Sequence, residues 1–258
     1  MSRLLHPLAS RQRLLVAMAS STSGAQTNSC RGDCMVAGLL GTGEQWARFE
    51  IEWKRSVAEV GAGRSSLDGA EPRRSAALGG VIDTCGLTAI GSHVAGEEYE
   101  RLSLERQQSL TGGRPAEPCV LCFRHCVLEA ASQAANLPPE EKVCFVLDGQ
   151  DNLSSQAAWL FEEIKGLEPA PLRERLGALG FEPKQYFAPL QAAEWLGRKL
   201  LRLARSDRDD VEMCGPVPVD GSLPPRLLFK SFDRQAFRLL RMDWEERRIE
   251  WNRSFSRL

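Results

Sequence analysis

The sequence lacks the features that would assign it to several common classes of protein. No apolar run approaches the roughly 20 residues that a membrane-spanning helix requires, and no internal repeat is present. The formal net charge is −1, so the chain as a whole has no excess of positive charge that would attract nucleic acid or an anionic membrane. The sequence therefore predicts a soluble protein with no membrane partner, in which any contact with nucleic acid depends on a local basic patch.

Carboxylates are missing from the N-terminal segment, where Asp33 is the first acidic residue of the chain. Several arginines and serines precede it, which resembles the composition of a transit peptide, and Leu14–Ala19 resembles a weak signal core. This apolar core is too short for a secretory signal. We expect a frayed N-terminus over residues 1–12, then a strand from about Arg13 to Ala19 and a loop from Ser20 to Ser29.

A disulfide framework is not expected, although the eight cysteines form an even set. The chain is long, Cys144 lies inside an apolar strand pattern, and Cys85 lies at the end of an apolar helical pattern. Buried free thiols in a reducing cytoplasm explain these positions better than a secreted scaffold does. The predicted localisation is therefore cytoplasmic.

Three cysteines have a spacing that also suits zinc, in the segment Cys119-x-x-Cys122-x-x-His125-Cys126. The same segment reads as the start of an amphipathic helix, with Cys119, Cys122 and Cys126 on its apolar stripe. No second Cys-x-x-Cys pair follows to complete a tetrahedral site. A buried helix face and a zinc or thiol-based site both remain open, and the buried face is favoured.

The chain has an ordinary globular composition, with 258 residues, 43% hydrophobic and 26% charged. Its most informative stretch is Lys142–Asp151, a short apolar run that ends in an acidic turn. This pattern is typical of a strand buried on both faces. Asp148 then lies where a central strand ends, which is a recurring position for the chemistry of α/β proteins. The simpler interpretation is that Asp148 caps the turn or the following helix.

Further strands and helices follow from the periodicity of apolar residues. Thr42 is a plausible N-cap of the helix Gln45–Val60, with Gln45 in the capping-box position. The other predicted helices are Arg73–Thr84, Glu97–Arg106, Cys119–Asn136, Ser154–Gly166, Leu172–Leu179 with Gly180 as C-cap, Leu190–Ala204 and Ser231–Trp251. The other predicted strands are Met35–Leu40, Leu87–Val94 and Phe181–Phe187. This order predicts an α/β layered domain over residues 1–205, and a linker with a C-terminal helical extension over residues 206–258.

Five blocks of the sequence resemble, in the same order, the bacterial family catalogued as domain of unknown function 3800. The blocks are Val36–Trp53, Ile90–Tyr99, Cys122–Cys126, Phe145–Gln150 and Phe187–Glu194. The resemblance spans roughly Leu14 to Ala204 and implies a ribonuclease H-like fold with a central mixed sheet flanked by helices. It also implies a suspected metal-dependent nuclease, in which carboxylates hold Mg²⁺ or Mn²⁺ ions that activate water.

The resemblance implies a specific set of site residues. Asp148 and Glu194 correspond to catalytic carboxylates and metal ligands. Asp151 is a further candidate ligand, and Gln150, Gln191, Ser21 and Ser23 are auxiliary groups. Apart from the resemblance, the basic residues Arg198, Lys199 and Arg202 of the late helix offer contacts to the phosphates of nucleic acid, although ordinary solvated charge is the favoured interpretation.

The chain departs from the family pattern at the end of the first strand. Where the family has Asp-Glu-Ser-Gly, this sequence has Ser21-Thr22-Ser23-Gly24, and hydroxyls do not neutralise a divalent cation. The segment Gly61–Pro72 contains no histidine to match the family's histidine segment. Two hypotheses follow. One is a family member with impaired or lost catalysis, which binds or regulates, and the other is a divalent-metal-dependent nuclease that uses Asp148 and Glu194.

Overall fold

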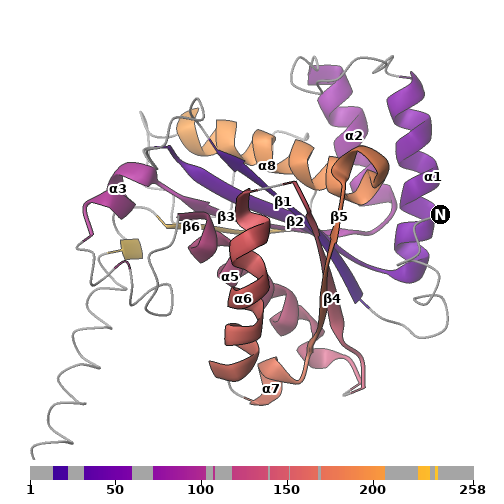
Figure 1. Cartoon of the computed structure of the whole chain (residues 1–258). Coiled ribbons are helices and arrows are strands. Elements are labelled where there is room, and N and C mark those ends of the chain that lie inside the picture. Colours follow the sequence, from indigo (N-terminus) through magenta and orange to yellow (C-terminus); the bar gives the residue numbers. More distant parts are fainter. Residues whose placement is uncertain are drawn as a thin grey trace, which may run out of the picture.

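The chain forms one six-stranded mixed sheet with helices on both of its faces (Figure 1). The computed structural model describes residues 14–22, 32–59, 72–102, 107, 118–138, 140–150, 152–167, 170–206, 226–232 and 236–237. The strands are β1 (Leu14–Thr22), β2 (Cys34–Thr42), β3 (Thr88–Val94), β4 (Val143–Asp148), β5 (Leu176–Glu182) and β6 (Leu227–Phe232). The predicted α/β layered domain with a mixed sheet flanked by helices is confirmed.

The helices lie between the strands along the chain, after an initial pair of strands. They are α1 (Gly43–Glu59), α2 (Pro72–Thr84), α3 (Gly96–Glu100), α5 (Pro118–Gln133), α6 (Asn152–Leu167), α7 (Ala170–Arg173) and α8 (Ala188–Ser206), with 3-10 turns η3 (Ala134–Asn136) and η4 (Lys184–Tyr186). Most of these bounds lie within two residues of the predicted ones, because the apolar periodicity is strong in the long helices.

The strand order is β5-β4-β1-β2-β3-β6, so β1 and β2 lie at the centre of the sheet. Strand β2 runs antiparallel to both of its neighbours, while β1, β4 and β5 are parallel and β6 is parallel to β3. The carboxyl ends of β1, β3, β4, β5 and β6 therefore meet at one edge of the sheet, together with the start of β2. This carboxyl edge is where the residues before Cys34 and after Asp148 come together.

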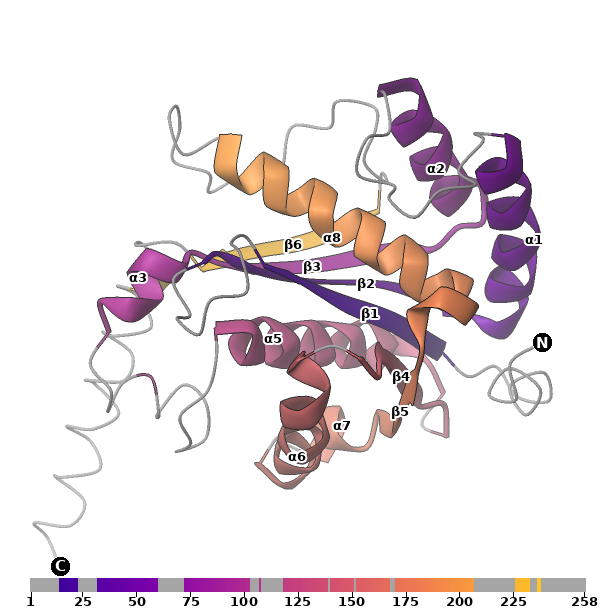
Figure 2. The same ribbon diagram turned by 45° about the horizontal axis from the view of Figure 1, so that its top comes forward.

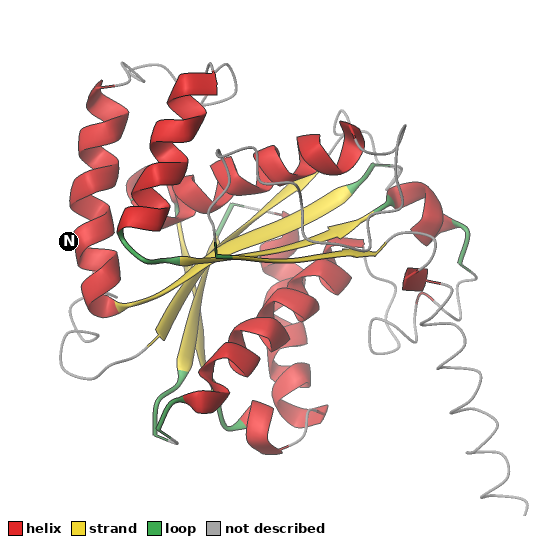
Figure 3. Cartoon of the chain, turned by 180° about the vertical axis from the view of Figure 1, so that it is seen from behind, coloured by secondary structure: helices red, strands yellow, loops and turns green. Residues whose placement is uncertain are grey.

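Two apolar layers hold the helices against the sheet (Figure 2). On one face, α5 and α6 cover residues such as Val16, Met18 and Phe145, which are at most 1% exposed. On the other face, α1, α2 and α8 pack over Ala17 and Met35, which are fully buried. Because successive side chains of a strand alternate between faces, each strand contributes to both layers. Figure 3 shows the strands from behind, fanning out between the two helical layers.

Helix α1 begins with the capping box that the sequence predicts. The amide of Gln45 donates to the Thr42 hydroxyl at 3.3 Å, and the Gln45 side chain accepts from the Thr42 amide at 2.8 Å. Gln45 also donates to the Gly86 carbonyl at 2.7 Å, which connects the start of α1 to the turn before β3. One side chain therefore fixes both the entry to the helix and its place on the sheet.

The predicted helix Leu172–Leu179 and the predicted strand Phe181–Phe187 are wrong. Helix α7 ends at Arg173, and β5 runs through Gly180, which is a strand residue and not a C-cap. Leucines at 172, 176 and 179 have helical spacing, yet pairing with the buried strand β4 determines the backbone here. Residues Lys184–Tyr186 form the 3-10 turn η4 where the strand was expected.

Two further expectations are corrected at the ends of the sheet. Strand β1 continues to Thr22, so Ser20–Thr22 pair with Cys34–Val36 and do not lie in a loop. The predicted start of the last helix at Ser231 is wrong, because Ser231 and Phe232 belong to β6, which pairs with β3. The sheet thus takes a strand from beyond residue 205. The predicted linker from 207 to 225 and most of the C-terminal helix lie outside the described residues.

Candidate functional site

Asp148 is the last residue of β4 and lies at the carboxyl edge of the sheet, only 4% exposed. Its neighbour two residues earlier, Val146, packs in the layer under α8, so alternation turns the Asp148 side chain toward α8 as well. Oδ1 accepts a hydrogen bond from the Gln150 amide at 3.1 Å. The simpler interpretation of Asp148 as a turn cap is therefore correct for this one oxygen, and Oδ2 has a different contact.

Lys184 joins the two predicted carboxylates into one charged group. Its ammonium Nζ lies 2.9 Å from Glu194 Oε1 and 3.6 Å from Asp148 Oδ2. Because one nitrogen contacts both, the two carboxylate oxygens are well inside the separation of about 8 Å beyond which they could not share a metal pair. The structure does bring Asp148 and Glu194 together, and an ammonium lies between them.

Glu194 has a second cationic partner on its own helix. Arg198, one turn further along α8, places Nη2 2.6 Å from the same Oε1 atom. Burial alone would lower the pKa of Lys184, but its hydrogen bond to Glu194 and the charges of Glu194 and Asp148 raise that pKa above its usual value. Lys184 is therefore a firm cation at neutral pH, and two cations balance the two anions of the site.

This arrangement does not fit a divalent metal site. A hard cation such as Mg²⁺ or Mn²⁺ needs several oxygen ligands that are free of competing positive charge. Here the Glu194 carboxylate is already bound by Lys184 and Arg198. Among the described residues, no group of three or more His, Cys, Asp or Glu side chains is arranged to hold a metal ion. The predicted ligand pair is thus an ion-pair cluster in this structure.

The predicted auxiliary residues have different positions. Gln150 is exposed and contacts Asp148 through its backbone amide. Gln191 donates from Nε2 to the carbonyls of Lys184 and Gln185, each at 3.2 Å, so it holds η4 against α8. The backbone of Ser21 pairs with Met35 in the sheet. Ser23 and Asp151 lie outside the described residues.

The three residues predicted to contact nucleic acid all lie on α8. Arg198 is engaged with Glu194, and Lys199 lies over the ring of Trp195 with Nζ 5.6 Å from its centroid. Arg202 is exposed. Helix α8 as a whole carries Glu194 as its single acidic residue and four basic ones, of which Arg205 is the last, so its own charge is +3.

A second polar cluster at the carboxyl edge was not predicted. Asp33, 4% exposed, accepts from the Gly96 amide at 3.1 Å and lies 3.5 Å from Arg205 Nε. His93 Nε2 is 4.0 Å from Asp33 Oδ2, and His93 Nδ1 is 3.0 Å from the Ser231 hydroxyl. His93 is near the end of the predicted strand Leu87–Val94, a position where a structural histidine is more common than a site residue. The signal for Asp33 was its place directly before an apolar strand.

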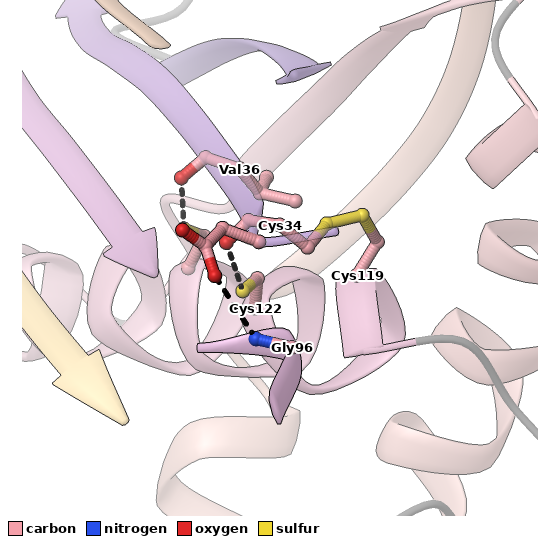
Figure 4. The surroundings of a disulfide bond; sticks show 7 residues. Cys34, Val36, Gly96, Cys119 and Cys122 are labelled. Carbon is pink, nitrogen blue, oxygen red and sulfur yellow. Dashed lines mark hydrogen bonds between the residues drawn. A yellow bond between two sulfur atoms is a disulfide. The ribbon is translucent and has the colours of Figure 1, made fainter. Parts of the chain in front are cut away.

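Four cysteines lie on the opposite face of the sheet, in the layer of α5 and α6: Cys34, Cys119, Cys122 and Cys126. Figure 4 shows the surroundings of the disulfide in this layer. Cys34 at the start of β2 forms a disulfide with Cys119 at the start of α5, so the expectation of free thiols is wrong for this pair. The thiols of Cys122 and Cys126 donate to the carbonyls of Cys34 and Val36, at 3.6 and 3.5 Å.

The remaining thiols in the described part of the chain, Cys85, Cys122, Cys126 and Cys144, are free, as predicted. Burial raises the pKa of Cys122 to about 12, since hydrogen bonds to it only partly offset the cost of burying a thiolate. With Cys119 in a disulfide, the predicted zinc spacing has no set of three thiols left to hold a metal. Cys30 and Cys214 lie outside the described residues.

Comparisons with known proteins identify no close relative of this chain. No family model matches the sequence, and no curated protein matches it either. Among solved structures, the chain is similar to the crystal structure of Bst-RNase HIII in complex with Mn²⁺, at 16% identity and a TM-score of 0.47. The similarity covers 80% of this chain and 57% of that chain, so it spans little more than half of that protein's length.

This likeness concerns the arrangement of the fold, and nothing that the neighbour binds or does is transferred to this chain through it. The structure itself shows the predicted mixed sheet flanked by helices, while the ribonuclease H-like assignment stays a prediction. As for membranes, none of the helices among the described residues combines the length and the apolar character needed to cross one.

Proposed function

We propose that this chain is a ribonuclease H-like protein of the domain of unknown function 3800 family whose metal-dependent catalytic centre is inactive, and that it acts by binding. The observation that carries the proposal is the Lys184 ammonium between Asp148 and Glu194. A cation of the chain itself takes up the negative charge that a divalent ion would require. The replacement of the first-strand carboxylates by Ser21 and Thr22 supports the same conclusion.

The proposal fits the electrostatics of the site. Bringing Mn²⁺ to Asp148 and Glu194 means displacing Lys184 and Arg198, or placing a divalent ion beside two positive charges. At 4 Å and an effective dielectric constant near 20, losing one ion pair or adding one repulsion between positive charges costs on the order of several kcal/mol. A pair of carboxylates that lacks further acidic ligands does not recover that cost.

The direct test combines metal binding with nuclease activity. We expect isothermal titration calorimetry to give a Kd for Mn²⁺ in the millimolar range, and no cleavage of single-stranded or duplex DNA, RNA or hybrid in Mg²⁺ or Mn²⁺. Lys184→Met removes the competing cation at similar length and should bind Mn²⁺ more tightly than the wild type. Lys165→Met is the matched control, because Lys165 is a lysine of α6 that pairs with Glu162 and lies over the ring of Phe161.

The second candidate is an active metal-dependent nuclease, and one observation favours it. The Lys184 side chain is 39% exposed, so its ammonium has room to leave the carboxylates when an ion arrives. This candidate predicts tight binding of two ions to the wild type, and cleavage that is lost in Asp148→Asn and Glu194→Gln. That combination of results would overturn the inactive assignment.

A further inference from the structure

The described chain exposes few large apolar side chains, and one of them lies beside the ion-pair cluster. The three are Ile51, Phe181 and Tyr186, which are 63%, 39% and 85% exposed. Tyr186 ends the turn η4 that begins with Lys184. A tyrosine ring that is almost fully in water, next to a charged cluster and at the start of a basic helix, has no role in the core.

The backbone that carries Tyr186 is firmly held. Its amide donates to the Pro183 carbonyl at 3.1 Å, and the following residue, Phe187, is 4% exposed in the layer under α8. Gln191 of α8 binds the carbonyls of Lys184 and Gln185 from the other side. The ring is thus presented on a rigid support, which lowers the entropy lost when a flat group stacks on it.

Positive charge continues from this ring along α8. The helix carries a charge of +3, and beyond Glu194 it has Arg198, Lys199, Arg202 and Arg205 with no acidic residue between them. Arg202 and Arg205 are exposed, and Arg205 shares its charge with Asp33. Because Lys184 and Arg198 balance Asp148 and Glu194, the ion-pair cluster between ring and cations adds no net negative charge of its own.

We propose that Tyr186 and the basic side of α8 form a binding surface for single-stranded nucleic acid, with one base stacked on the tyrosine ring and the phosphates along α8. This inference rests on the proposed function, since it gives the inactive centre a partner that is bound and not cut. Stacking requires an unpaired base, whereas a duplex keeps its bases stacked on one another. From Ala188 to Arg202 the helix is about 22 Å long, enough for several nucleotides of a single strand.

Phe181 does not belong to this surface, although it is close in sequence. It pairs with Leu147, whose side chain lies in the layer of α5 and α6, so alternation turns Phe181 to that face. Ile51 lies on α1 and is remote from η4 in sequence. These two side chains are therefore matched controls, one near in sequence and one remote, for the loss of an exposed apolar group.

The test is fluorescence anisotropy with fluorescein-labelled oligothymidylate of about ten nucleotides, a length within the site sizes of single-strand binders, at low salt and in EDTA. We expect the wild type to bind this probe and to bind a duplex of the same length at least tenfold more weakly. Tyr186→Ala should weaken binding at least tenfold, and Tyr186→Phe should restore it because phenylalanine keeps the stacking face. Arg202→Gln should reduce the dependence of affinity on salt.

Several outcomes overturn the inference. One is that the wild type fails to bind the probe, or binds probe and duplex with equal affinity. Another is that Tyr186→Ala binds as tightly as the wild type, or that Phe181→Ala and Ile51→Ala lose as much affinity as Tyr186→Ala does. Self-association of the wild type that Tyr186→Ala abolishes, without probe binding, would assign the surface to a second copy. Because EDTA removes divalent ions, a failure to bind the probe would not contradict the proposal that the catalytic centre is inactive. Cleavage in Mn²⁺ would contradict that proposal and would leave the binding result unaffected.

Discussion

The two faces of the sheet differ sharply at the same carboxyl edge. On the α5 face, the groups near the edge are sulfur atoms, with a disulfide between Cys34 and Cys119 and a thiol of Cys122 bonded to a carbonyl. On the α8 face, Asp33 and Asp148 meet cations from α8 and η4. One face is crosslinked and neutral, and the other is charged. Among the described residues at this edge, the buried carboxylates with their cations thus lie on the α8 face and the crosslink lies on the α5 face.

The largest effect is expected from opening the crosslinked face. Cys119→Ser removes a bridge between residues 85 apart in sequence, and loop-closure entropy gives about 4 kcal/mol of lost unfolding free energy. Urea unfolding of the oxidised protein measures it. Reductant should bring the wild type down to the level of the variant and leave the variant unchanged. Equal midpoints for oxidised and reduced wild type would contradict a stabilising role for the bridge.

A smaller loss is expected at the buried acid of the charged face. Asp33→Ala leaves the Gly96 amide without its acceptor and removes the carboxylate near Arg205 and His93, at a cost of about 2–3 kcal/mol. Arg205→Gln is the control, because its side chain is 56% exposed and should cost under about 1 kcal/mol. Chemical denaturation compares the two. A loss in Arg205→Gln as large as in Asp33→Ala would show that the exposed ion pair dominates.

His125 of α5 lies on the crosslinked face and should make the stability of the protein sensitive to acid. Burial of His125 lowers its pKa, and the charge of Lys230 lowers it further, while Glu129 opposes both. The unfolded chain then binds a proton more readily than the folded one, so stability is complete above about pH 6.5 and falls as the pH drops below it. Between pH 7.5 and 5.5 the thermal midpoint of His125→Gln should fall less than that of the wild type, because glutamine does not titrate. Parallel curves for the two proteins would exclude this contribution.

The smallest effect on stability is expected at the ion-pair cluster itself. Asp148→Asn keeps the acceptor for the Gln150 amide and removes one of two anions near Lys184. Because Lys184 and Arg198 are 39% and 37% exposed, solvent screens these pairs and the loss should not exceed about 1 kcal/mol. The same urea series measures it. A loss comparable to that of Cys119→Ser would mean that the charged face also carries the fold.

What the sequence predicted is what local patterns determine. Strand β4 matches its predicted end at Asp148, because β-branched and aromatic residues followed by an acidic turn have few other solutions. The capping box of Thr42 and Gln45 was also readable from residue types alone. The convergence of Asp148 and Glu194 came from the family resemblance and stands in the structure.

What the sequence did not predict depends on distant pairing. Nothing in the sequence distinguishes Lys184 from other lysines, and it lies near Asp148 because of the course of β5 and η4. The partner of Cys34 was not deducible, since many pairings are open among eight cysteines. Most of β6 had no predicted element, and its last two residues were placed in a helix, whereas pairing with β3 makes the whole segment a strand. In each case the deciding contact joins residues far apart in the chain.

Strand β6 has a consequence for the order of events during folding. It adds to β3 by pairs such as His93 with Ser231, which lie 138 residues apart, whereas β1, β2 and β3 are joined by neighbouring antiparallel pairings. Closing so long a loop costs entropy before any pairing is gained, so the antiparallel strands have the kinetic advantage. During synthesis on the ribosome, the edge of β3 that pairs with β6 stays unpaired until residue 232 has been synthesised. The edge of β3 is therefore open to strand addition by other chains while residues 95–232 are being synthesised.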